Sequence, residues 1–297
     1  MKTGTKRPRL NHVAVVVNPA AGRAGPGAAG EVERILGELG VKGAVTTPGE
    51  AGLEACLRAA LDTKPDLLAI VAGDGTARAA AEMVGPRGPL LAPLPGGTMN
   101  MLPNALYHGR DWKTALADIL TDGVERRVSG GEIDGHAFYV AAILGSPALW
   151  AEAREAARRG NLGGAIDRAR RALRRAFSGR LRFSLGRRPY AKAEALALMC
   201  PLVSRAMDDG EGHLEAAAID PAGALDVFRL GFHAALGDWR ADPKVVVTRV
   251  RAGRAWASGP IPAVLDGEPI QLGPVADFHF RPVAFKALTP REAEVRA

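Results

Sequence analysis

The sequence lacks the features that mark secreted, metal-clustered and membrane-spanning proteins. Only two cysteines occur among its 297 residues, Cys56 and Cys200, and its six histidines are scattered without ligand spacing. Neither a disulfide framework nor a paired-cysteine zinc site can form, which predicts a reducing compartment. The longest apolar run is Ala137 to Leu144, whereas a membrane-spanning helix needs about 20 such residues. We therefore expect a cytoplasmic protein.

Acidic residues are scarce in one segment. Residues 150–192 contain twelve arginines and one lysine against three acidic residues, a local charge of +10 in a chain whose net charge is +7. Within it, apolar residues recur at helical spacing opposite a row of arginines: Ile166, Ala169, Leu173 and Phe177. Such a helix either contacts the anionic inner face of a membrane peripherally or presents a solvated face. The arginine row at 168–175 contains no aromatic residue, so we expect no nucleic-acid partner; the oligomeric state cannot be inferred.

The first 125 residues are predicted to form an α/β domain. Hydrophobic residues make up 47% of the chain and charged residues 24%, which is typical of a globular protein. Short apolar runs alternate with segments of helical period, which predicts a parallel sheet with right-handed crossovers. The expected strands are 12–17, 44–47, 67–71 and 90–94, and the expected helices include 31–39, 53–61 and 77–84.

Residues 126–281 are predicted to form a second, mostly antiparallel, β-sandwich-like domain. Short apolar runs separated by Gly, Pro and Asp support this assignment, and an arginine-rich helical insertion is expected at about 150–178. The expected strands are 138–143, 181–185, 195–199, 225–230, 245–248, 263–265 and 278–280. The tail, about 282–297, is expected to pack back on the first domain.

Three glycine-bearing loops follow strands of the predicted parallel sheet. They read NPAAG at 18–22, AGDGT at 72–76 and PGGTMN at 95–100. Ligands of such sheets bind beyond the carboxyl ends of the strands, so the three loops should share one edge. Glycines let the backbone approach a ligand, and helix starts offer unpaired N–H groups to an anion. The pattern predicts a phosphate cradle, with the Asp74 carboxylate beside it to hold Mg²⁺ or accept a proton.

These loops, with the downstream segment Asp266-Gly267-Glu268, resemble the diacylglycerol kinase catalytic-domain family. The family's marks are NPxxG, GGDGT, PxGTxN and DGE, and the four segments keep that order over about 250 residues. The resemblance implies an ATP-dependent lipid kinase with a nucleotide-binding α/β domain and a β-sandwich-like domain, acting in lipid metabolism. It implies ATP and Mg²⁺ as cofactors and a lipid hydroxyl, that of diacylglycerol or a related lipid, as acceptor.

The resemblance also implies roles for individual residues. Asp74 and Glu268 are the expected catalytic residues, with Glu268 accepting the proton of the lipid hydroxyl. The expected nucleotide-binding residues lie in the three loops and after the second strand: Asn18, Thr46 (or Thr47), Gly73, Asp74, Gly75, Thr76, Gly97, Thr98 and Asn100. The residues that hold a metal ion are not assigned.

The sequence departs from the family pattern at three points. Ala72 replaces the first glycine of GGDGT, Met101 stands where an acidic residue often follows, and Ala222 replaces an aspartate that helps to hold a structural Mg²⁺. Two alternatives therefore remain open. One is a kinase similar to NAD kinases, which share the GDGT loop, and the other is a non-catalytic protein that binds a nucleotide or a lipid.

Overall fold

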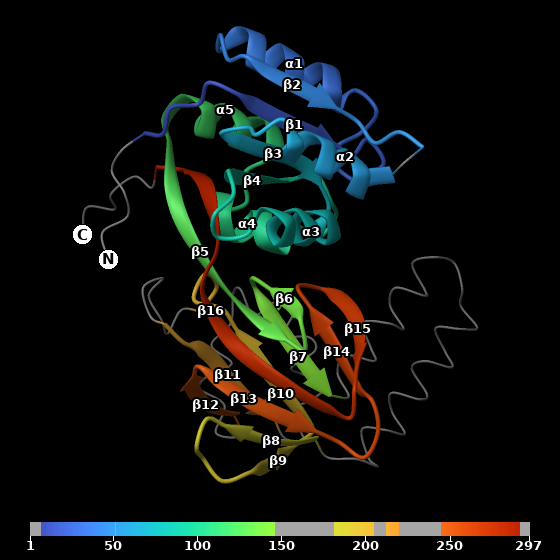
Figure 1. The fold of residues 1–297 in the computed structure, drawn as a ribbon, viewed down its shortest axis with the longest axis vertical. Coiled ribbons are helices and arrows are strands. Elements are labelled where there is room, and N and C mark those ends of the chain that lie inside the picture. Colours follow the sequence, from blue (N-terminus) through green and yellow to red (C-terminus); the bar gives the residue numbers. More distant parts are fainter. Residues whose placement is uncertain (1–6, 51, 146–180, 205–211, 220–244, 292–297) are drawn as a thin grey trace. The chain divides into compact units, whose positions relative to one another are not determined.

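The chain folds into two compact units. The computed structural model describes residues 7–50, 52–145, 181–204, 212–219 and 245–291 (Figure 1). Unit 1 comprises Met1–Val128 and Val283–Ala297, and unit 2 comprises Ser129–Pro282. Because both boundaries fall inside strands, β5 (Gly123–Ile133) and β16 (Val275–Pro290), the chain passes between the units twice.

Unit 1 is built on a parallel sheet in the order β2-β1-β3-β4. Its middle strands β1 and β3 are buried along their whole length because helices cover both faces. The last part of β16 adds a parallel neighbour to β4, with Ala287 paired to Leu91. The elements are β1 (Val13–Val17), α1 (Ala28–Glu38), β2 (Gly43–Thr46), α2 (Gly52–Asp62), β3 (Leu67–Ala72), α3 (Asp74–Val84), β4 (Leu90–Pro95), α4 (Met101–Tyr107) and α5 (Trp112–Asp122).

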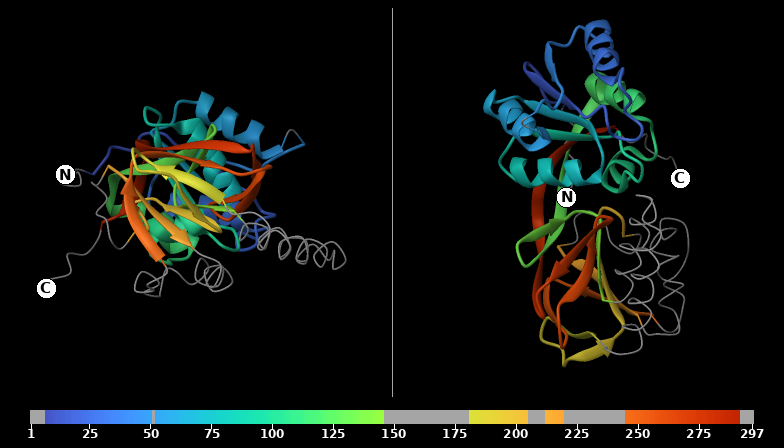
Figure 2. Two further views of the ribbon diagram at one scale, coloured as in Figure 1. Left: turned by 90° about the horizontal axis from the view of Figure 1, so that it is seen from below. Right: turned by 90° about the vertical axis from the view of Figure 1, so that its right-hand side faces the viewer.

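The helices of unit 1 form two groups that cover opposite faces of its sheet. The chain moves from β1 outward to β2 and then back past β1 to β3, so right-handed crossovers place α1 and α2 on opposite faces. Helix α1 packs against α5, while α2 contacts α3 and α3 contacts α4 (Figures 1 and 2). The carboxyl ends of β1, β3 and β4 consequently open at one edge of the sheet.

Unit 2 is a sandwich of antiparallel strands. One sheet has the order β12-β11-β10-β7-β14-β15, and the other contains the first part of β16 with β13, β8 and β9, as well as β5 and β6. The remaining strands are β6 (His136–Phe138), β7 (Ala141–Gly145), β8 (Leu181–Leu185), β9 (Ala191–Ala193), β10 (Ala195–Met199), β11 (Leu214–Ile219), β12 (Val245–Val250), β13 (Ala252–Trp256), β14 (Ile261–Leu265) and β15 (Glu268–Leu272). The predicted α/β fold with a second β-sandwich-like part is confirmed.

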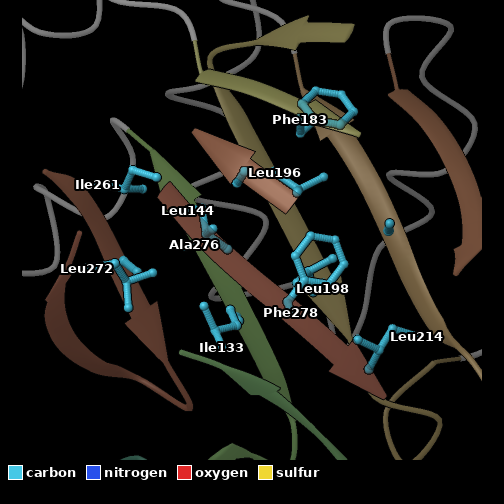
Figure 3. Packing of buried hydrophobic residues seen from close by; sticks show 14 of the residues in the cluster. Ile133, Leu144, Phe183, Leu196, Leu198, Leu214, Ile261, Leu272, Ala276 and Phe278 are labelled. Carbon is cyan, nitrogen blue, oxygen red and sulfur yellow. The ribbon is translucent and has the colours of Figure 1, made fainter. Parts of the chain in front are cut away.

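The core of unit 2 lies between its two sheets. Alternate residues along each strand face inward, as the two-residue period of a strand requires. Phe183 of β8 and Phe278 of β16 meet Leu196 and Leu198 of β10 in this layer (Figure 3). Every one of these side chains is at most 4% exposed.

Several sequence expectations need correction or fall outside the described residues. The predicted strand 138–143 is two strands, β6 and β7, because the chain turns at Tyr139 and Val140. The predicted strand 225–230 and the arginine-rich insertion 150–178 lie outside the described residues. In the part of the chain that the structure describes, no helix is long and apolar enough to cross a bilayer.

Candidate functional site

The three predicted loops meet at the carboxyl edge of the unit 1 sheet. The Asn18 amide, directly after β1, donates to the Val71 carbonyl of β3 (2.9 Å). In the same first loop, the amides of Arg23 and Ala24 both donate to the Gly96 carbonyl, at 2.8 and 3.1 Å. The Gly96 amide in turn donates to the Ala72 carbonyl (3.1 Å). Backbone hydrogen bonds therefore connect all three loops, which the sequence predicted to share one edge.

The loops approach one another so closely that side chains are excluded between them. A Cβ atom at Gly97 would lie 2.5 Å from the Gly73 Cα atom, and one at Gly96 would lie 2.6 Å from the Ala72 nitrogen. A Cβ atom at Gly22 would lie 2.9 Å from the Thr98 hydroxyl oxygen. Gly96 and Gly97 require glycine because backbone atoms approach them closely, whereas Gly73 itself has an ordinary extended conformation, with φ of −88°.

Asp74 occupies the first position of α3 at this edge. Gly73 is the N-cap of the helix, and Asp74, Gly75 and Thr76 form its first turn. The N–H groups of a first turn have no partners within the helix and attract negative charge. Asp74 is half-buried here, so its carboxylate lies beside a group of backbone donors that favours an anion.

Asn100 shapes the third loop through its side chain. Its side-chain oxygen accepts a hydrogen bond from the Gly97 amide (2.7 Å), and its side-chain nitrogen donates to the Gly97 carbonyl (2.8 Å). The residue is fully buried and left-handed, with φ of 52°, a conformation that asparagine tolerates better than most residues. Both ends of the amide are thus engaged within the loop, and direct binding of the nucleotide by Asn100 stays a prediction.

Two predicted threonines stay accessible at the same edge. Thr98 is exposed between Gly97 and the start of α4. Thr46 ends β2, the strand beside β1, and its hydroxyl lies 3.5 Å from the Val15 carbonyl and 3.6 Å from the Cys56 sulfur. The structure therefore gathers the predicted nucleotide-binding residues at one edge of unit 1, while Glu268 belongs to unit 2.

The Asp266-Gly267 segment forms the turn between β14 and β15. Leu265 pairs with Glu268, which leaves a two-residue loop, and both loop residues have positive φ, 48° and 89°. Positive φ at both positions is typical of type I′ hairpins, for which Asp-Gly is a favoured sequence. Glu268 follows as the first residue of β15, and its side chain is exposed.

The Asp266 carboxylate is buried, and sequence analysis did not assign it a role. It accepts three backbone hydrogen bonds, from the amides of Tyr139 (2.7 Å), Val140 (2.8 Å) and Ala141 (3.0 Å). The Asp266 amide also donates to the Ala141 carbonyl (2.9 Å). The turn that carries Glu268 is thereby fixed to the link between β6 and β7, which explains why the predicted strand 138–143 is interrupted there.

Asp266 also influences Cys200. The Cys200 sulfur lies 3.7 Å from the Phe138 carbonyl oxygen in the core of unit 2. Burial raises the pKa of the Cys200 thiol well above its ordinary value, and the negative charge of Asp266 raises it further. Cys200 is therefore a neutral packing residue rather than a nucleophile.

Replacing Asp266 with Asn is expected to destabilise the protein. The substitution keeps the side-chain shape and the tolerance for positive φ, but an NH₂ group then faces backbone N–H donors. Loss of charge-assisted bonds to buried donors costs roughly 2–4 kcal/mol. We expect thermal denaturation to show a melting temperature about 5–15 °C lower.

The matched control is Asp134→Asn. Asp134-Gly135 is a second two-residue hairpin turn in unit 2, also with positive φ at both residues, but Asp134 is exposed. Its carboxylate accepts a single backbone bond, from the Asp277 amide. An equal loss of stability in both variants would show that the turn conformation, and not the buried carboxylate, accounts for the effect.

A ready-made metal cluster is not found among the described residues, where no three His, Cys, Asp or Glu side chains come together. The carboxylates of the two motif segments, Asp74 and Glu268, lie in different units.

Residues 12–133 match the family model of the diacylglycerol kinase catalytic domain. The resemblance predicted from the sequence is confirmed. The matched residues contain all three loops of unit 1 but end before Asp266. The match to this family model thus covers the loop surface of unit 1, whereas Glu268 lies beyond it.

Solved structures agree with the fold of this family. A diacylglycerol kinase from Bacillus anthracis str. Sterne is 13% identical with a TM-score of 0.68, over 95% of this chain and 98% of that one. Yeast NADH kinase, solved in complex with NADH, is 12% identical with a TM-score of 0.51, over 96% of this chain and 84% of that one. No curated protein matches the sequence significantly. At these identities the likeness shows a shared fold across both units of the chain.

Proposed function

We propose that this protein is an ATP-dependent lipid kinase that transfers the γ-phosphoryl group of ATP to a lipid hydroxyl, that of diacylglycerol or a related lipid. The observation that carries the proposal is the joining of the three loops, by backbone hydrogen bonds, into one surface beside Asp74. A surface built from glycine backbone suits a phosphate chain, because the amides can approach its oxygens without side-chain obstruction. The confirmed family resemblance supports the same reaction class.

The residues of unit 1 fit a nucleotide with its Mg²⁺. The helix start at Gly73–Thr76 and the loop at Gly96–Thr98 supply backbone donors and hydroxyls for phosphate oxygens, and Asn18 and Thr46 lie at the neighbouring strand ends. The Asp74 carboxylate is a hard oxygen ligand of the kind that Mg²⁺ prefers. When bound, Mg²⁺ would neutralise charge on the phosphate chain, which is most of what phosphoryl transfer requires from its site.

Glu268 is proposed as the proton acceptor. In the transfer, a bond forms between the lipid oxygen and the γ-phosphorus, the bond from that phosphorus to the bridging oxygen breaks, and ADP leaves. The hydroxyl proton passes to the Glu268 carboxylate, which is exposed and carried by a turn that the buried Asp266 holds in place. The fold shared with a diacylglycerol kinase over nearly the whole chain supports including unit 2 in this proposal.

The decisive experiment is turnover of labelled ATP with dispersed diacylglycerol, a total lipid extract or NAD as acceptor. We expect a phosphorylated lipid and no labelled NADP. The NAD arm is included because the chain shares its fold with an NADH kinase. Labelled NADP would favour that second function, and nucleotide binding without any labelled product would identify a non-catalytic binding protein.

We also propose that the arginine-rich insertion 150–178, which lies outside the described residues, contacts the membrane peripherally.

A substitution at Gly97 tests the loop surface. Gly97→Ala places a methyl group where it would overlap Gly73, so the second and third loops must separate. We expect ATP affinity, measured by calorimetry, to fall at least about tenfold, with a stability loss of about 1–3 kcal/mol from overpacking. Gly37→Ala is the control, because Gly37 is exposed on α1 and a Cβ there would meet nothing within 4 Å. Unchanged ATP affinity in Gly97→Ala would remove this loop from the nucleotide site.

A further inference from the structure

The hairpin of β8 and β9 presents cations without compensating acidic residues. Residues 181–193 contain Arg182, Arg187, Arg188 and Lys192 and neither aspartate nor glutamate. Arg182, Arg187 and Lys192 are exposed, while Arg188 donates to the Thr248 hydroxyl (3.1 Å). This hairpin is the described part of the basic segment 150–192.

Apolar and aromatic side chains lie beside these cations on the same face of the sheet. Strand pairing aligns Lys192 with Arg182, Arg182 with Trp256, and Trp256 with Val275, so the four form one row across β9, β8, β13 and β16. The adjacent row, which includes Phe183, points into the core (Figure 3). Because neighbouring residues of a strand point to opposite faces, the row that includes Arg182 points away from the core.

Tyr190 completes this surface. Its ring lies 6.1 Å from that of Trp256, tilted by 56°. Tyr190 is 61% exposed and Val275 is 50% exposed, and these are two of only four large hydrophobic side chains strongly exposed among the described residues. We call the surface formed by Arg182, Tyr190, Lys192, Trp256 and Val275, together with the exposed Arg187 in the turn between β8 and β9, the hairpin face.

Nearby acidic charge does not neutralise the hairpin face. Asp277, in the next row of the sheet, is paired with Arg254 through two contacts of 2.6 and 2.8 Å. That pair contributes no net charge, and among the described residues no acidic side chain pairs with Arg182, Arg187 or Lys192. A cationic surface with exposed aromatic and aliphatic groups complements a lipid layer, whose headgroups can be anionic and whose interior is apolar.

We propose that the hairpin face is a peripheral membrane-binding surface that selects anionic lipids. Arg182, Arg187 and Lys192 would interact with the headgroups, while Tyr190 and Trp256 would lie at the boundary between headgroups and acyl chains, where amphipathic rings are favoured. Nucleic acid fits less well, because Tyr190 and Trp256 form a single tilted pair, whereas binding of a single strand uses a series of rings on which successive bases stack. The surface does not include the arginine-rich insertion 150–178 and does not require the chain to be a kinase.

Vesicle binding by the full-length protein tests the proposal. Cosedimentation would compare vesicles of phosphatidylcholine alone with vesicles containing roughly a third phosphatidylglycerol at physiological salt. We expect binding only to the anionic vesicles, and we expect Arg182→Gln combined with Lys192→Gln to weaken it at least about tenfold. Tyr190→Ser should weaken binding several-fold, and Tyr190→Trp should restore it.

The control is Lys42→Gln combined with Arg87→Gln, which removes two exposed cations from unit 1. Equal weakening by both double variants would mean that only net charge matters and would overturn the proposal, as would full binding by the hairpin variant. The proposal would also be overturned if the hairpin double variant lost RNA binding or self-association while it still bound vesicles. A protein that binds vesicles through this face but phosphorylates no lipid would support the surface and refute the proposed function.

Discussion

Replacing Asp74 with Asn is expected to remove nearly all lipid phosphorylation while leaving the fold intact. The substitution preserves size but removes the charge that would hold Mg²⁺ or accept a proton beside the loop surface. Asp74 is the first residue of α3, so loss of a favourable interaction with the helix dipole costs only about 0.3–1 kcal/mol. Initial-rate assays with saturating ATP, combined with thermal denaturation, would separate the two effects.

Asp62→Asn is the matched control for this experiment. Asp62 ends α2 in the same unit and is exposed, so the same chemical change there should leave turnover unaltered. If Asp74→Asn retains more than about a tenth of wild-type turnover, the barrier has changed by less than about 1.4 kcal/mol. Asp74 would then have no essential role, and the proposed site would lose its only carboxylate in the GDGT loop.

The second large effect is expected for Glu268→Gln. Glutamine keeps the shape and one hydrogen-bond acceptor but cannot take up a proton, and loss of a general base costs roughly 10²- to 10⁴-fold in rate. We expect kcat to fall by that factor while ATP affinity and melting temperature stay constant, because the side chain is exposed at the start of β15. Slow hydrolysis of ATP by water should fall much less, since no lipid hydroxyl is deprotonated in that reaction.

The outcomes for Glu268 discriminate between roles. Near-wild-type lipid phosphorylation would exclude Glu268 from the mechanism and leave Asp74 as the candidate base. Weakened ATP affinity would instead assign Glu268 to nucleotide or metal binding. Comparison with Asp266→Asn is informative, because that variant should lose stability first, whereas Glu268→Gln should lose rate without loss of stability.

Periodicity and loop chemistry predicted unit 1 well. Apolar runs such as 67–71 are local features, and right-handed crossovers leave little freedom in how such elements assemble. The helix predicted at 77–84 begins earlier than expected, at Asp74. The convergence of the three loops followed from that topology. The sequence could not reveal that Asn100 turns its amide back onto Gly97, because that bond depends on a left-handed backbone conformation.

Unit 2 was less predictable because its strands pair across long stretches of chain. Residues 138–143 have the composition of one strand, yet the carboxylate of Asp266, more than 120 residues later, binds the amides at the turn between two. The Asp-Gly turn itself is a local signal, but Asp134-Gly135 carries the same signal with an exposed carboxylate. Tertiary packing alone decides that the Asp266 carboxylate is buried and that the Asp134 carboxylate is exposed.

The two passages of the chain between the units have a consequence for folding during synthesis. Unit 1 is completed only by β16: the Tyr107 hydroxyl, fully buried, donates to the Leu288 carbonyl (3.1 Å), and Arg291 pairs with Asp122 (3.0 Å). A ribosome that has released residues 1–128 has therefore exposed a sheet whose β4 edge still lacks its neighbour. A fragment ending there would leave the Tyr107 hydroxyl without its acceptor, so the inserted unit 2 must be made before the first unit can close.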